Sequence, residues 1–144
     1  MDLAASQIVS LRPVSQAKLS PNDRLIATAN WDGGLGIVES DSLKLKYSLE
    51  KTHVGKAGGV SWSADGKSIV SGGEDGLVKH FSVTSTQLHE NIAFRGHERR
   101  VTDTDYNPTQ SFIASASFDM TWRLWDLNTG SELLLQEGHS REVY

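Results

Sequence analysis

The sequence predicts an all-β fold assembled from repeated four-stranded units. Three segments align without gaps, at residues 20–38, 63–81 and 107–125, and their aspartates Asp32, Asp75 and Asp119 lie 43 and 44 residues apart. Short strands and turn residues fill each period, and a period of about 40–45 residues is typical of a propeller blade. We therefore expect a β-propeller of about three blades plus the start of a fourth, which is an incomplete ring.

Length and composition restrict the class of protein. A chain of 144 residues with 38% apolar and 22% charged residues suits one globular domain. The net charge of −4 argues against broad, charge-driven binding to naked nucleic acid. The absence of cysteine excludes disulfides and thiolate zinc sites, and it suits the cytosol or the nucleus. Neither a secretory signal nor an apolar run of about 18 residues is found.

Strands and repeat boundaries follow from the local pattern. Runs rich in aromatic and branched residues alternate with turn residues such as those at 65–66, 75–76 and 128–130. In the third unit the predicted strands are Val101–Tyr106, Phe112–Ser117, Trp122–Leu127 and Glu132–Gln136. The predicted repeats are residues 1–52, a degenerate first unit, then 53–95, 96–137 and the start of a fourth at 138–144.

Histidines provide a second marker of the repeat. His53 and His97 each precede the aspartate of their unit by 22 residues. His139 follows His97 by 42 residues and opens the fourth unit.

The third unit resembles a nearly ideal WD repeat, through Gly96-His97, the segment 114–119 and the segment Trp122-Arg-Leu-Trp-Asp126. Within that superfamily, GHERRVTD, SFDMTWRLWD and ELLLQEGHSREVY resemble the WD-repeat splicing factors of the U4/U6 small nuclear ribonucleoprotein, the Prp4 family. HVGKAGGVSW and EDGLVKHF of the second unit are also similar. The resemblance covers roughly residues 14–144, and it implies that an N-terminal region and about half of the propeller fall outside this sequence.

The WD pattern implies a hydrogen-bonded network in the third unit. His97 is expected to meet Asp119, which also binds a strand hydroxyl, Ser115, whose oxygen meets the indole N–H of Trp125. Ser117 is the alternative hydroxyl if the register is displaced by two residues. Such a network fixes several strands in one register because buried polar groups must be paired.

The other two units depart from this pattern. The second unit has His53, Ser71 and Asp75, but Phe81 replaces the tryptophan, so the last link is lost. The first unit has Thr28 and Asp32, with Ser10 at the histidine position and Val38 at the tryptophan position. These units are expected to depend on apolar packing.

Catalytic, metal and phosphate sites are poorly supported. A His–Ser–Asp trio that recurs once per repeat suits a structural role better than a catalytic triad. His53, His97 and His139 lie one blade apart, too far to share a metal ion. The glycines at 33–36 lack the lysine and the following helix of a phosphate-binding loop. We therefore expect no catalytic residue, cofactor or metal.

A cluster of arginines provides a candidate binding surface. Arg95, Arg99 and Arg100 flank His97 in a loop between blades, and Arg141 occupies the matching loop of the next unit. Such loops form one rim of a propeller, where a basic patch can bind an acidic protein surface or RNA phosphates. The alternative is an ordinary solvated loop in which Glu98 pairs with an arginine.

The resemblance implies a non-catalytic, nuclear scaffold of the U4/U6 particle in pre-mRNA splicing. Its implied partners are the U4/U6 proteins, including the splicing factor Prp3, and the U4/U6 RNA through the particle, with direct RNA contact left open. No membrane and no small-molecule substrate are expected. The alternatives are a generic WD-repeat adaptor, for example in ubiquitin ligation or signalling, and a propeller hydrolase.

Three blades cannot close a propeller, since rings have roughly four to eight. An open arc leaves one apolar face bare at each end, and an uncovered strand edge invites pairing with other chains. We therefore expect the isolated chain to aggregate or to oligomerise.

Overall fold

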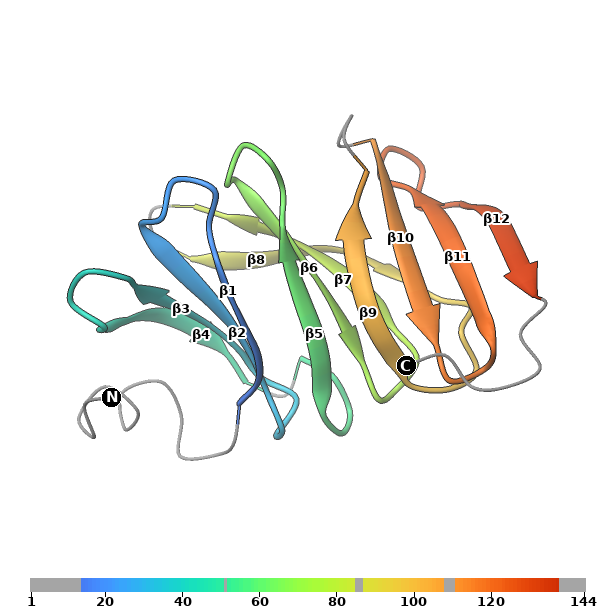
Figure 1. The fold of residues 1–144 in the computed structure, drawn as a ribbon, viewed down its shortest axis with the longest axis horizontal. Coiled ribbons are helices and arrows are strands. Elements are labelled where there is room, and N and C mark those ends of the chain that lie inside the picture. The colour runs from blue at the N-terminus through green and yellow to red at the C-terminus, as the bar shows by residue number, and fades with distance from the viewer. Residues whose placement is uncertain (1–13, 51, 85–86, 108–110, 138–144) are drawn as a thin grey trace.

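The computed structural model describes residues 14–50, 52–84, 87–107 and 111–137, and it shows three four-stranded antiparallel sheets standing side by side (Figure 1). The first sheet contains β1 (Val14–Leu19), β2 (Leu25–Asn30), β3 (Leu35–Glu39) and β4 (Leu45–Leu49). The second contains β5 (Ala57–Trp62), β6 (Ser68–Gly73), β7 (Val78–Val83) and β8 (Leu88–Phe94). The third contains β9 (Val101–Tyr106), β10 (Phe112–Ser117), β11 (Thr121–Asp126) and β12 (Glu132–Glu137).

Each sheet is a meander whose strands pair in chain order, which confirms the all-β fold of repeated units. In the third sheet, β9 and β10 have the predicted bounds. The strand β11 begins and ends one residue earlier than predicted, and β12 extends one residue further. The earlier start of β11 follows from a tight turn, in which the backbone N–H of Thr121 bonds to the side chain of Asp119.

The first core lies between the first two sheets. One face of the first sheet contributes Ala27, Ala29, Leu35 and Ile37, all completely buried. The facing side of the second sheet contributes Ala57, Val60, Ile69, Phe81 and Leu88. Alternate residues of a strand point to the same face, so the period-two pattern of β2 and β3 produces this apolar layer.

The second core repeats the first one blade further along. The opposite face of the second sheet contributes Val70, Val78 and Phe94, and the third sheet contributes Val101, Ile113 and Trp125. The rings of Phe94 and Trp125 are 5.5 Å apart, centroid to centroid. Each inner sheet face is therefore covered by its neighbour, as in consecutive propeller blades.

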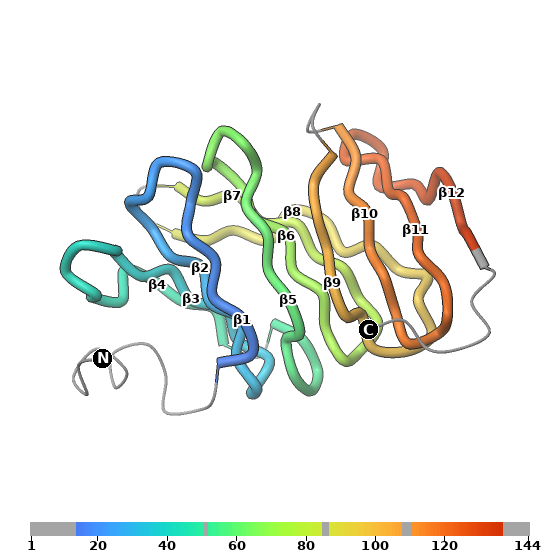
Figure 2. The backbone as a smooth tube through the Cα atoms, viewed as in Figure 1, coloured from blue at the N-terminus to red at the C-terminus, as the bar shows by residue number. Residues whose placement is uncertain are grey.

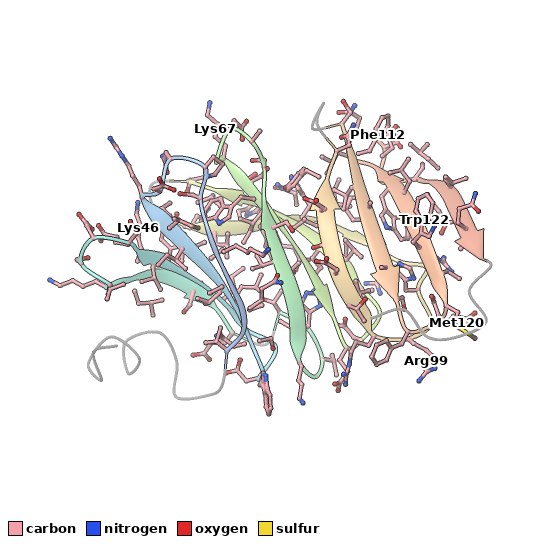
Figure 3. All side chains as sticks on the ribbon, in the orientation of Figure 1. Lys46, Lys67, Arg99, Phe112, Met120 and Trp122 are labelled. Atoms are coloured by element: carbon pink, nitrogen blue, oxygen red, sulfur yellow. The ribbon has the colours of Figure 1, made fainter. Side chains whose placement is uncertain are left out.

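The far face of the third sheet has no covering sheet among the described residues. Trp122 occupies the position of the fully buried Val78 in the second sheet, yet it is 37% exposed. Ala114 and Ala116 line the same open face beside it. Figure 3 shows Trp122 on this outer side of the molecule.

One end of the molecule carries all the loops between sheets, and we call it the loop rim. It comprises the described parts of the turns 31–34, 74–77 and 118–120 and of the loops 50–56 and 95–100, together with the adjoining ends of the strands. Figure 2 shows the chain passing from each sheet to the next at this end, and Figure 3 places Arg99 and Met120 there. The innermost strands β1, β5 and β9 stand next to one another and begin at this rim (Figure 1).

Glycine in the turns of the loop rim allows the next blade to approach closely. A Cβ atom at Gly33 would lie 2.0 Å from the carbonyl oxygen of His53, and one at Gly76 would lie 2.6 Å from that of His97. Both glycines have positive φ angles, which glycine adopts without strain. The third turn has Met120 at this position, with φ of 68°. A chain packing against this turn must therefore accommodate a side chain. Within the described residues there is no helix capable of crossing a membrane.

Candidate functional site

The third blade contains a four-residue network behind the loop rim. The ring nitrogen Nδ1 of His97 is 3.0 Å from the carboxylate of Asp119, and Nε2 is 2.7 Å from the hydroxyl of Ser115. The indole N–H of Trp125 donates to the same hydroxyl at 2.8 Å. The four predicted residues are therefore together, but His97, not Asp119, contacts Ser115. Asp119 binds the hydroxyl of Thr121 instead.

The donor and acceptor groups of these four side chains allow only one arrangement of protons in the network. Trp125 can only donate, and an ionised Asp119 can only accept. Ser115 accepts from Trp125 and donates to Nε2 of His97, so the proton of the neutral imidazole lies on Nδ1 and faces the carboxylate. Burial lowers the pKa of His97, and this effect outweighs the opposing influence of Asp119. The neutral tautomer therefore suits the site.

Asp119 joins two segments of the loop rim. Its carboxylate accepts the backbone N–H of Glu98 at 3.1 Å and that of Thr121 at 3.0 Å. Burial raises the pKa of Asp119, but the hydrogen bonds from Thr121, His97 and Glu98 lower it more, to about 2. The ionised carboxylate thus holds the loop 95–100 against the turn at 118–120.

The second blade repeats the network without its last link. His53 lies 3.0 Å from Asp75 and 2.7 Å from Ser71, and the backbone N–H of Val54 donates to Asp75 at 2.9 Å. Phe81 is completely buried at the tryptophan position, and its ring has no N–H that could donate to Ser71. Burial raises the pKa of Asp75, but the hydrogen bonds from His53, Val54 and Leu77 together lower it more.

The first blade has only fragments of the network. Asp32 accepts the backbone N–H of Gly34 at 2.9 Å, and the hydroxyl of Thr28 lies 3.5 Å from the carbonyl oxygen of Gly36. Val38 is buried at the tryptophan position. Ser10, at the histidine position, lies outside the described residues.

Two features of the third network were not apparent from the sequence. Ser117 does not replace Ser115: its hydroxyl donates to the carbonyl oxygen of Arg99 and accepts the backbone N–H of Asp119. Arg123 pairs with Glu132 at 2.7 Å. A Cβ at Gly96 would lie 2.4 Å from this arginine's Nη1, so a glycine before His97 makes room for the pair. The pattern of spacings alone did not point to this packing.

The described arginines of the candidate patch differ in their surroundings. Arg95 is exposed, Arg99 donates to the carbonyl oxygen of Phe118 at 3.3 Å, and Arg100 pairs with Glu74 of the second blade at 2.6 Å. Glu98, which the solvated-loop alternative pairs with an arginine, binds Asp119 through its backbone N–H. Arg141 lies outside the described residues.

The loop rim also contains a depression that sequence reasoning missed. It has a volume of about 440 Å³ and lies where β1, β5 and β9 begin. Its lining includes two aromatic and two cationic side chains: Trp31, Phe118, Lys56 and Arg100. The available signal in the sequence was a tryptophan next to the turn residues Asp32-Gly33, and in the structure Trp31 is 47% exposed. Within the described ranges no group of three or more potential metal ligands occurs.

Comparison with known proteins identifies the repeat. Residues 44–82 and 86–126 match the family described as "WD domain, G-beta repeat". The chain is 43% identical over 141 residues to the U4/U6 small nuclear ribonucleoprotein PRP4 of Saccharomyces cerevisiae, covering 96% of this chain and 30% of that protein. It is 27% identical to human WD repeat-containing protein 37, covering 96% of this chain and 29% of the relative.

A solved structure supports the fold. The structure of U3-55K superimposes with a TM-score of 0.85 at 20% identity, covering 92% of this chain and 42% of that one. The chain thus spans about a third of the length of the curated relatives named here. With its family match and its three successive four-stranded sheets, the chain belongs to the WD-repeat family of β-propeller proteins.

Proposed function

We propose that this chain is part of a non-catalytic scaffold of the U4/U6 small nuclear ribonucleoprotein that acts in pre-mRNA splicing in the nucleus. The observation that carries the proposal is the 43% identity to the yeast PRP4 protein over 96% of this chain. WD repeat-containing protein 37 reaches only 27% over the same 96% of the chain, and the 43% identity to Periodic tryptophan protein 2 homolog is confined to 47% of it.

The burial of the polar network supports a scaffold rather than an enzyme. The Ser115–His97–Asp119 geometry resembles a serine hydrolase triad, in which histidine activates the serine hydroxyl. However, Ser115 is only 2% exposed, and its oxygen already accepts the N–H of Trp125. The same arrangement recurs with a completely buried Ser71. A nucleophile that no substrate can reach, present in two copies, fits a structural role.

A rigid platform is the physical basis of the proposed scaffold. The network binds the backbone of Glu98 and Thr121 to one carboxylate, and Arg100 joins the second and third blades through Glu74. Loops held in this way can present side chains to a partner with little loss of conformational entropy on binding. The loop rim is therefore the proposed binding surface, with Arg95, Arg99 and Arg100 as its basic residues. Arg141, outside the described residues, stays a predicted member of this cluster.

The proposed partners are the proteins of the U4/U6 particle, including the splicing factor Prp3, with the U4/U6 RNA associated through the particle. No membrane, small-molecule substrate or cofactor has a part in this proposal. The net charge of −4 favours protein partners over extended contact with RNA.

Affinity purification tests the proposal. The tagged protein is isolated from nuclear extract, and the recovered RNA and proteins are identified. Recovery of U4 and U6 RNA together with Prp3 is the expected result. The competing proposal is a general WD-repeat adaptor, since WD repeat-containing protein 37 matches the same 96% of this chain. Recovery of an unrelated assembly without U4 and U6 RNA would favour the adaptor.

A further inference from the structure

The depression on the loop rim combines features from all three blades. Trp31 comes from the turn between β2 and β3, Lys56 from the residue before β5, and Arg100 and Phe118 from the third blade. Ser15, Gly58, Val101 and Thr102 at the beginnings of β1, β5 and β9 complete its lining. The described residues that line it include no acidic side chain, although the chain as a whole carries a net charge of −4. The described lining of the depression is therefore cationic, whereas the chain as a whole is anionic.

Both cations are held over aromatic rings. The ammonium of Lys56 lies 3.9 Å from the centroid of the Trp31 ring, and the guanidinium carbon of Arg100 lies 5.5 Å from that of Phe118. Cation–π contact restricts where these charges can move, and partial removal from water strengthens their attraction for an anion. Arg100 uses one nitrogen, Nη2, to bind Glu74, and a guanidinium with five N–H donors can bind a second anion.

The same geometry argues against a stacked nucleotide base. Base stacking uses aromatic faces, and here a cation already lies over one face of each of the two rings, which leaves only the opposite faces for contact. A carboxylate needs only the cations and N–H donors. The exposed apolar surface of Trp31 beside them suits an adjacent apolar side chain. Charge and shape thus favour a peptide in which an acidic residue is next to an apolar one.

We infer that this depression binds an acidic segment of a partner protein, whose carboxylate contacts Lys56 and Arg100 while a neighbouring apolar side chain packs on Trp31. This inference rests on the proposed function, since it identifies the chemistry by which the loop rim would bind a protein of the particle. Lys56, Trp31 and Phe118 are assigned to binding here in addition to the arginine cluster.

A peptide array tests the inference with the purified chain. The probes are peptides in which leucine or phenylalanine is flanked by aspartate or glutamate, and the same peptides with asparagine or glutamine instead. A dye-labelled oligouridylate is the RNA probe. We expect the carboxylate peptides to bind at least about tenfold more tightly than their amides, a difference of about 1.4 kcal/mol.

Matched lysine variants locate the site. Lys56→Met removes the charge but retains a side chain that can cover Trp31, and it is expected to lower the affinity about tenfold or more. Lys46→Met is the control, because Lys46 also lies over an aromatic ring, 5.7 Å from the Tyr47 centroid, but at a distance from the loop rim (Figure 3). Circular dichroism melts serve to check that both variants fold.

Three outcomes would overturn the inference: equal binding of acid and amide peptides, an equal loss in both lysine variants, or oligouridylate as the preferred ligand. Purification from nuclear extract separates this result from the proposed function. Selective peptide binding without recovery of U4 and U6 RNA supports the acidic-peptide site and contradicts the U4/U6 assignment. Recovery of those RNAs without selective peptide binding overturns only the inference about the depression.

Discussion

The indole nitrogen of Trp125 donates a hydrogen bond across 2.8 Å to the buried hydroxyl of Ser115. In the second blade, Phe81 fills the same position, so Ser71 bonds to His53 without an indole partner. At the aspartate the blades differ because Thr121 donates its hydroxyl to Asp119, whereas the second blade has Leu77 at this position. At the serine they share a histidine–serine–aspartate unit and differ in one N–H group. This difference allows the contribution of the complete network to be measured within one molecule.

Loss of either hydrogen-bond partner of Ser115, His97 or Trp125, is expected to destabilise the third blade. His97→Ala removes one hydrogen-bond partner from each of Ser115 and Asp119, and Trp125→Phe removes the only N–H that the ring offers. Each change should cost about 1–3 kcal/mol, because buried groups lose their hydrogen bonds. Urea denaturation measures the loss. Val54→Ala, at an 81% exposed site, is the control, and unchanged melting of both variants would contradict a structural role for the network.

Removal of the serine hydroxyl is expected to cost more in the third blade than in the second. Ser115→Ala leaves both Trp125 and His97 without their partner, whereas Ser71→Ala leaves only His53. The difference should be about 1 kcal/mol, the size of one hydrogen bond. Parallel denaturant titrations of the two variants measure it. Equal losses would show that the indole bond adds nothing to stability.

Acid is expected to destabilise the fold in two successive ranges. The pKa of His97 is lowered below 6.5 mainly by burial, so below pH 6.5 the unfolded state binds a proton that the folded state does not. The pKa of Asp119 is lowered from 3.8 to about 2, so its contribution is present above pH 3.8 and is lost as the pH falls towards 2. Each shift makes the free energy of unfolding decrease as the pH is lowered. The free energy of unfolding, measured by urea titration at a series of pH values, tests this. Asp119→Asn should flatten the lower range, and higher stability in acid would contradict the assignment.

Charge reversal at Arg99 and Arg100 is expected to weaken association with partners without unfolding the protein. Arg100 pairs with Glu74 at a site where both side chains are about 40% exposed, and such pairs contribute about 0–1 kcal/mol. Arg99 is likewise exposed. Recovery of U4 and U6 RNA by the Arg99→Glu, Arg100→Glu double variant should fall severalfold. Unchanged recovery with unchanged melting would identify the cluster as solvated surface.

The open face of the third sheet is expected to promote self-association of this chain. Trp122 is 37% exposed, whereas Val78 at the equivalent position is completely buried by the next sheet. Trp122→Lys should shift the chain towards monomer because it removes apolar surface from that face. Size-exclusion chromatography with light scattering measures the mass. The control is Val54→Lys, and the same mass for Trp122→Lys and the unaltered chain would contradict this role.

The repeated spacing of short strands and turn residues was sufficient to predict the sheets. Strand type depends on local alternation and turn chemistry, both visible in residues 112–126. The bounds of β10 were therefore predictable, while those of β11 shifted by one residue because Asp119 holds Thr121 in the turn. The resemblance to the WD repeat identified His97, Ser115, Asp119 and Trp125 as one group.

Tertiary structure alone decided how these residues connect and what surrounds them. Whether Asp119 bonds to Ser115 or to Thr121 depends on side-chain directions that sequence spacing does not specify. Arg100 is 26 residues from Glu74, and Lys56 is 25 residues from Trp31, yet both pairs meet at the loop rim. Sequence determines the strands because their signals are local, whereas packing of one blade on the next determines which distant side chains share a surface.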